Sequence, residues 1–231
     1  EMLQIWTFKH VQVCSFRPQQ LGKNTAYFFK ENSEFGVREI QRIGLILEFD
    51  LSYITYLELK NQVITTPFSF IATSSSIKWN GLDPVFADTD KDIGNMLLES
   101  VKKNINSSTS GILAVHNYGI PGDVVGMETL AKKHNLPLIY DAAPALGVKL
   151  NNKTLLKFGD LSVLSFHATK VFTTFEGGAI ISHSKSMKNK IDRIRNFGIK
   201  DEYTVENLGI NAKMSEPNAA LGLLQLKYFD S

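Results

Sequence analysis

The stretch GDLSVLSFHATKVFTTFEGG, residues 159–178, decides the fold. An apolar run around Val163 leads into a polar segment that carries Lys170, and a second apolar run begins after Gly178. Apolar runs bounded by glycine and polar residues are typical of strands, and the pair of Gly177 and Gly178 lets the backbone bend close to a ligand. We therefore predict two strands with a lysine on the loop between them.

Lys170 has two interpretations. An arbitrary lysine is most often a solvent-exposed residue on a loop. A lysine that lies among hydroxyl residues between two strands could instead be an activated amine, because burial and nearby positive charge favour the neutral, nucleophilic form of an amine. Such an amine can form a Schiff base with an aldehyde cofactor.

Asp141 favours the cofactor interpretation. It follows the apolar run LPLIY, residues 136–140, which we predict to be a buried strand, and α/β sheets bind ligands at the carboxyl ends of their strands. Pyridoxal phosphate needs a lysine for its aldehyde and an acid that keeps its pyridine nitrogen protonated. Alone, Asp141 could equally be a helix N-cap for Ala142 and Ala143.

The residues before Asp141 alternate between strand and helix patterns. Strands are predicted at 62–65, 84–88, 111–116 and 136–140, and helices at 74–80 with a start within 68–73, at 95–105 and at 125–134. A strand, helix, strand rhythm indicates an α/β fold with a mostly parallel central sheet flanked by helices. A further long helix is predicted to begin at 219–229.

Four stretches resemble the sugar-nucleotide aminotransferases of the DegT/StrS family. They are TTPFSFIATSSSIKWNGLDPVFADTD, IYDAAPALGV, GDLSVLSFHATKVFTTFEGGAII and GINAKMSEPNAALGLLQL, which together cover about residues 61–227. The resemblance implies the large domain of a fold-type-I transferase that depends on pyridoxal 5'-phosphate. Within the family, the SFHATK and NAKMSE motifs look most like members that make 4-amino-4,6-dideoxy sugars.

The resemblance also implies a role for five residues. Lys170 would bond the cofactor aldehyde and move the proton, and Asp141 would pair with the pyridine nitrogen. Phe70 would stack on the cofactor ring, and Ser165 would donate a hydrogen bond to its phosphate. Asn211 would reach the phosphate of a partner subunit, which implies a homodimer with shared active sites.

The implied reaction is transamination of a nucleotide-linked 4-keto-6-deoxysugar, with L-glutamate as amino donor, in the synthesis of amino sugars for polysaccharides. A dehydratase-like member would have histidine in place of the lysine, so Lys170 argues against that class. The family needs no metal, and Asp88 and Asp90 are expected to end a strand at a loop. His116 is expected to be structural, with a possible substrate contact.

Three features depart from the family pattern. Pro144 occupies a position where many members have glutamine or histidine, and proline offers no side-chain donor. Residues 1–60 carry no recognisable phosphate-binding turn and are interpreted as a divergent N-terminal segment before a cofactor-binding large domain at 61–231. The small C-terminal domain is expected to be missing. The alternative function is therefore a truncated or non-catalytic relative that serves as a regulator, a partner subunit or an inactive relic.

Composition excludes several other classes. The chain has 231 residues, of which 43% are hydrophobic, and a net charge of +2 gives no reason to expect nucleic acid or an anionic membrane as a partner. The single cysteine, Cys14, cannot form an internal disulfide, and no 18-residue apolar run occurs, so we expect a cytoplasmic protein. Neither of the nucleotide-binding motifs G-x-G-x-x-G and G-x-x-x-x-G-K-[ST] is present, so a nucleotide-binding module of another class is the least favoured alternative.

Overall fold

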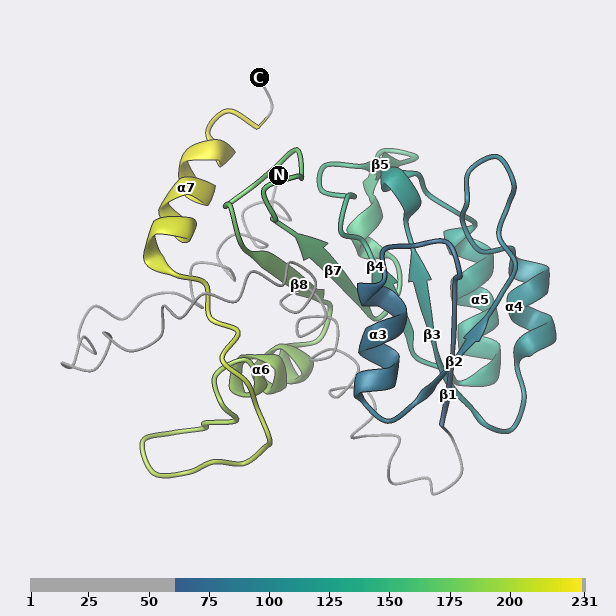
Figure 1. The fold of residues 1–231 in the computed structure, drawn as a ribbon, viewed down its shortest axis with the longest axis horizontal. Helices are drawn as coiled ribbons and strands as arrows, with labels where there is room; N and C mark the ends of the chain where they lie inside the picture. The colour runs from purple at the N-terminus through teal and green to yellow at the C-terminus, as the bar shows by residue number, and fades with distance from the viewer. Residues whose placement is uncertain (1–60, 230–231) are drawn as a thin grey trace.

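The structure, a computed structural model, describes residues 61–229 and contains one six-stranded sheet in the order β2-β1-β3-β4-β7-β8 (Figure 1). Five strands run parallel, and only the edge strand β8 is antiparallel to its neighbour β7. The strands are β1 (Gln62–Thr65), β2 (Asp83–Phe86), β3 (Thr109–Val115), β4 (Leu138–Asp141), β7 (Leu161–Ser165) and β8 (Gly178–Ser182), beside a two-stranded ribbon of β5 (Lys149–Leu150) and β6 (Lys153–Thr154). The predicted α/β fold with a mostly parallel sheet is confirmed.

Helices α3 (Ala72–Trp79), α4 (Leu98–Asn104) and α5 (Val124–His134) connect successive parallel strands from β1 to β4. Helices α6 (Lys185–Ile194) and α7 (Glu216–Leu226) follow β8, and two short 3-10 turns are η2 (Asn117–Gly119) and η3 (Leu155–Lys157). None of the helices between residues 61 and 229 is long and apolar enough to cross a membrane. The prediction of a divergent segment at 1–60 lies outside the described residues.

Two apolar clusters cover the two faces of the sheet. Side chains alternate between the faces along each strand, so Ile112 packs in one cluster and Leu113 in the other. The first cluster includes Val101 of α4 and Met127 of α5. The second includes residues of α3 and α6, namely Ala72, Ile77, Ile191 and Ile194. The protein is therefore a three-layer sandwich in which α4 and α5 cover one face and α3 and α6 the other.

Most predicted elements lie where the apolar pattern placed them, and the main difference is α4. The pattern predicted a helix from residue 95, whereas α4 begins at Leu98. Met96 instead forms an isolated bridge with Thr89, and the backbone of Leu97 is extended. Helix α7 begins at Glu216, three residues before the predicted start, because Pro217 fits the first turn of a helix, where its missing N–H is not needed.

His116 is a buried structural residue on the face covered by α4 and α5. Only 1% of it is exposed, and its ring stacks on Tyr140 with the centroids 4.3 Å apart. Its Nε2 has no hydrogen-bond partner within residues 61–229. Burial lowers the pKa of His116 to about 4, because a buried imidazolium loses its hydration.

We predict that His116 lowers the free energy of unfolding when the pH is lowered. The unfolded state binds a proton at His116 near pH 6.5 and the folded state only near pH 4, so stability is lost as the pH falls through this window. The expected loss is about 3 kcal/mol. Urea denaturation at pH 7 and pH 4.5 should show a smaller loss for His116→Phe than for the wild type.

His134 provides the control for this prediction. It is exposed and lies in the last turn of α5, so its ring is not part of the buried core. His134→Gln should therefore keep the full acid loss of the wild type. An equal acid loss in the His116 variant and the wild type would contradict the prediction.

Candidate active site

The candidate site lies at the carboxyl edge of the parallel strands. Asp141 is the last residue of β4 and Ser165 the last residue of β7. Strand alternation directs both side chains to the face covered by α3 and α6, since Ile139 and Val163 belong to that cluster. His116 lies on the opposite face with Tyr140, so its ring is outside this group of side chains.

Asp141 is a buried carboxylate with two identified donors. It is 5% exposed, and its Oδ2 accepts a hydrogen bond of 2.8 Å from the Thr73 hydroxyl. Its Oδ1 accepts one of 3.2 Å from the Ala143 amide. No helix follows, because the chain turns back with the Ala145 amide bonded to the Ala142 carbonyl, so the interpretation of Asp141 as a helix N-cap is wrong.

A relay of hydroxyl groups orients this carboxylate. The Thr73 hydroxyl donates its proton to Asp141, so it must accept from Ser69, whose Oγ lies 2.7 Å away. Ser69 directly precedes Phe70, and the Phe70 carbonyl accepts a hydrogen bond from the Thr73 amide. The relay therefore ties the segment that carries Phe70 to the end of β4.

Phe70 is 55% exposed, which is unusual for a large apolar side chain before a helix. The sequence left open whether it packs in the core, and the structure shows that it does not. An exposed ring beside the carboxyl edge is available to a planar ligand.

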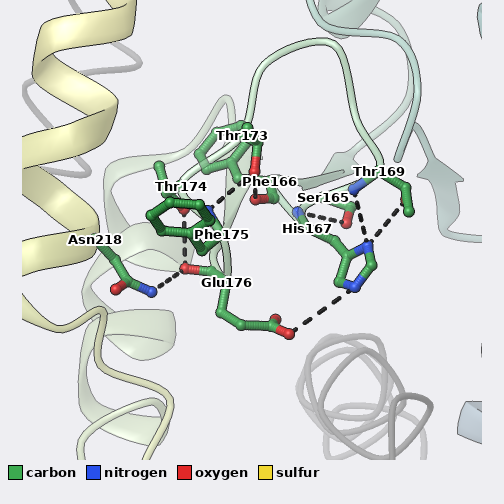
Figure 2. A network of polar contacts seen from close by, with 9 residues as sticks. All are labelled: Ser165, Phe166, His167, Thr169, Thr173, Thr174, Phe175, Glu176 and Asn218. Carbon is green, nitrogen blue, oxygen red and sulfur yellow. Dashed lines mark hydrogen bonds and ion pairs between the residues drawn. The ribbon is translucent and has the colours of Figure 1, made fainter.

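Lys170 lies on the loop between β7 and β8. The Lys170 amide donates to the His167 carbonyl at 2.9 Å, which closes a turn. His167 Nδ1 accepts a hydrogen bond from the Thr169 amide at 3.2 Å and lies 2.9 Å from the Thr169 hydroxyl (Figure 2). The Lys170 side chain is half-buried and forms no ion pair within residues 61–229. No salt bridge between residues 61 and 229 therefore neutralises the amine of Lys170.

The ends of this loop are closed by backbone hydrogen bonds. The Phe166 amide donates to the Gly177 carbonyl, and the Phe166 carbonyl accepts from the Thr174 amide, both at 2.9 Å. The Thr173 hydroxyl also donates to the Phe166 carbonyl (Figure 2). Ser165 lies directly before the closure and is 7% exposed, and its Oγ accepts a hydrogen bond of 3.3 Å from the His167 amide.

Glu176 faces His167 across the loop. Its Oε1 lies 3.9 Å from His167 Nε2 (Figure 2). Because Nδ1 accepts the Thr169 amide proton, a neutral His167 carries its own proton on Nε2, toward the Glu176 carboxylate. At 3.9 Å this contact is longer than a hydrogen bond.

Asn211 lies on the segment after α6. It is exposed, pairs with Asn196 as an isolated bridge, and its Oδ1 accepts from the Lys213 ammonium at 2.6 Å. Burial lowers the pKa of Lys213, and the positive charge of Arg195 adds to the shift. The structure therefore does not bring Asn211 into contact with Asp141, and gives it an exposed, positively charged setting instead.

The residues at the edge fit pyridoxal phosphate. Asp141 and Ser165 end neighbouring strands there, Lys170 lies on the loop that follows Ser165, and the exposed ring of Phe70 belongs to the segment tied to Asp141; an amine, a carboxylate, a hydroxyl and an aromatic ring are the groups that an aldehyde-bearing pyridine phosphate requires. No cluster of metal-ligating side chains occurs in the part of the chain that the structure describes. Asp88 and Asp90 instead accept hydrogen bonds from Ser100 and from the amides of the next turn.

Several residues that contact the site or its loop were not assigned a role from the sequence. They are Ser69, Thr73, His167, Glu176, Asn218 and Gln225. His167 and Glu176 lie inside the SFHATK and EGG stretches, so their proximity to Lys170 in sequence could have identified them. The others reach the site only through tertiary structure.

Comparisons with known proteins show the family of the chain. Residues 47–231 match the model of the DegT/DnrJ/EryC1/StrS aminotransferase family. The dTDP-4-amino-4,6-dideoxy-D-glucose transaminase of Shigella dysenteriae is 51% identical over 195 residues, which cover 83% of this chain and 53% of that protein. The aminotransferase PseC of Helicobacter pylori, involved in the biosynthesis of pseudoaminic acid, superposes with a TM-score of 0.75 at 36% identity over 82% of this chain and 51% of its own.

A second solved structure contains a cofactor. NtdA of Bacillus subtilis, with bound cofactor PMP, superposes with a TM-score of 0.72 at 28% identity over 84% of this chain and 42% of its own. The chain spans about half the length of the curated relatives that it matches first.

We predict that Thr73 and Asp141 are energetically coupled. A hydrogen bond to a charged acceptor contributes about 1.5–3 kcal/mol, so Thr73→Val should lower the free energy of unfolding by roughly that amount. In an Asp141→Asn background the same change should cost about 1 kcal/mol less, because the acceptor is neutral. Urea denaturation of the four proteins measures the coupling.

Thr65 is the matched control. It is also buried, and its hydroxyl donates at 2.9 Å to the neutral carbonyl of Leu113. Thr65→Val should cost the same with Asp141 or Asn at position 141, and a zero coupling energy for Thr73 would contradict the predicted relay.

Proposed function

Since the chain belongs to the DegT/DnrJ/EryC1/StrS aminotransferase family, we propose that it transfers an amino group from L-glutamate to the 4-keto group of a nucleotide-linked 6-deoxysugar. The family's cofactor is pyridoxal phosphate. One observation carries the proposal. Strands β4 and β7 end at Asp141 and Ser165, at the same edge of the sheet. Lys170 lies on the loop that follows β7, and backbone hydrogen bonds close that loop.

The cofactor supplies an aldehyde that takes up the amino group and a ring that accepts electrons when the donor's C–H bond breaks. Lys170 would hold that aldehyde through its Nζ and carry the proton between the two carbon positions, acting in turn as base and acid. The buried carboxylate of Asp141 would keep the ring nitrogen protonated, because an adjacent negative charge favours the charged form. Ser165 would donate to the phosphate, and Phe70 would lie on the ring.

The substrate class rests on the named relatives. The Shigella dysenteriae relative is named for dTDP-4-amino-4,6-dideoxy-D-glucose, and a Helicobacter pylori relative with 39% identity is named for a UDP-linked 4-amino-4,6-dideoxy sugar. Both names describe an amino group at carbon 4 of a nucleotide sugar. A 4-keto sugar linked to dTDP is therefore the substrate we would test first.

A homodimer would complete the phosphate site. Asn211 is exposed beside Lys213 and Arg195, and its own chain does not place it against Asp141. From a second copy it could approach the phosphate, where the Lys213 ammonium that donates to Asn211 would add favourable charge. This part of the proposal predicts that the cofactor binds more weakly to a monomer than to a dimer.

We predict that Lys170 is the residue that pyridoxal phosphate modifies. The protein is incubated with the cofactor, reduced with borohydride and digested, and mass spectrometry should find the label on the peptide with Lys170. Lys170→Arg keeps the charge but should lose the label and the long-wavelength absorbance band. Lys185→Arg, at an exposed position in α6, should keep both.

The second step of the experiment adds substrates. L-glutamate should bleach the band, and a dTDP-linked 4-keto-6-deoxysugar should restore it with formation of the amino sugar. A label spread over exposed lysines, or a Lys170 label that no amino donor bleaches, would contradict the proposed transamination.

A further inference from the structure

Helix α7 contacts the lysine loop, defined as residues 166–177, through two amide side chains. Asn218 Nδ2 donates a hydrogen bond of 2.6 Å to the Glu176 carbonyl (Figure 2). Gln225 Oε1 accepts one of 3.0 Å from the Thr173 amide. The two residues are seven positions apart, which is about two helical turns, so they lie on one face of α7.

Between these two contacts the helix backbone lies very close to the loop. Gly222 is buried, and a Cβ atom at this position would lie 2.8 Å from Cγ2 of Thr174. Only a glycine permits this approach without displacement. The face of α7 that bears Asn218 and Gln225 is therefore packed against the loop along its length.

An aromatic contact continues this packing past the end of the helix. Phe172 is 3% exposed and lies edge-on to Phe166 at 4.9 Å and to Phe229 at 5.8 Å between ring centroids. Phe229 follows α7 by three residues. The loop is thus anchored to α7 by both apolar and polar contacts.

The two halves of the lysine loop are held differently. The half after Lys170 is fixed to α7 at Phe172, Thr173 and Glu176. The half before it is held by the His167 turn. Val171, which follows Lys170, is 99% exposed, so packing of its own side chain does not hold the backbone there. Lys170 lies where the two supports meet.

We propose that Asn218 and Gln225 are positioning residues, which act through the lysine loop to hold the Lys170 amine in reach of a cofactor at the Asp141 edge. The inference rests on the proposed role of Lys170. An amine that attacks an aldehyde must be held in a narrow range of geometry, and small displacements reduce the rate steeply. Loosening α7 from the loop should therefore slow the reaction of Lys170 without touching the amine itself.

The direction of each hydrogen bond gives a sharp test. A backbone carbonyl can only accept, so Asn218 must donate, and a backbone amide can only donate, so Gln225 must accept. A change from amide to carboxylate removes the donor at position 218 and sets two oxygens against each other. The same change at position 225 keeps the acceptor. One chemical substitution therefore has opposite expected outcomes at the two positions.

The experiment compares Asn218→Asp, Gln225→Glu and Gln225→Ala in the 231-residue chain, with Glu216→Gln as a control at an exposed position of α7. Hydrogen exchange without cofactor should rise about fivefold or more in the loop for Asn218→Asp and Gln225→Ala. Borohydride-trapped labelling of Lys170 by pyridoxal phosphate should slow by roughly tenfold in the same two variants. Gln225→Glu and Glu216→Gln should stay within about twofold of the wild type in both measurements.

Thermal unfolding gives the midpoint temperature of each variant. Labelling is then compared well below the lowest midpoint, so that a slower rate reflects the position of Lys170 and not loss of the fold. The proposal is overturned if the Asp and Glu variants behave alike, or if exchange rises while the labelling rate of Lys170 is unchanged. A wild type that is never labelled at Lys170 would overturn the proposed function and this inference together. Normal labelling of the wild type and of all variants would overturn this inference alone.

Discussion

The burial of the Asp141 carboxylate is the constraint on which the site depends. A buried charge is costly unless hydrogen bonds compensate it, and Asp141, at 5% exposure, ends a strand with neighbours on both sides. Two of its donors come from separate segments: the Thr73 hydroxyl from α3 and the Ala143 amide from the turn after β4. Satisfying the carboxylate therefore fixes α3 against the sheet, and with it the segment of Ser69 and Phe70.

The reversal of the last strand has an equally direct effect on the lysine. A parallel connection would need a long crossover, whereas the antiparallel pair of β7 and β8 is closed by a single loop. The Phe166 amide bonds to the Gly177 carbonyl at the base of that loop, directly after Ser165. Ser165 and Lys170 are thus placed by the same closure. The backbone of both residues is therefore fixed relative to the carboxyl edge of the sheet, although their proposed roles differ.

The sequence predicted the parts of this arrangement that depend on local pattern. Apolar runs placed the strands that end at Asp141 and Ser165, and the loop of Lys170 between two strands is confirmed. The supports of these residues were missed because they come from distant segments: Thr73 is 68 positions from Asp141, and Gln225 is 52 from Thr173. A threonine or glutamine in a helix has no distinctive pattern. Only the path of the chain decides which buried group it meets.

Exposed apolar side chains bear on how the site would be completed. Phe70, Val171 and Phe175 are each more than half exposed, although the strands beneath them are fully packed. A cofactor ring would cover Phe70, while Val171 and Phe175 extend from the lysine loop itself. Exposed apolar side chains on a loop mark a surface that can bind a partner or ligand. Asn211, exposed and bonded to the Lys213 ammonium, would supply a phosphate contact in the proposed dimer. Both features suit the proposed dimer, in which each subunit would cover the lysine loop of the other.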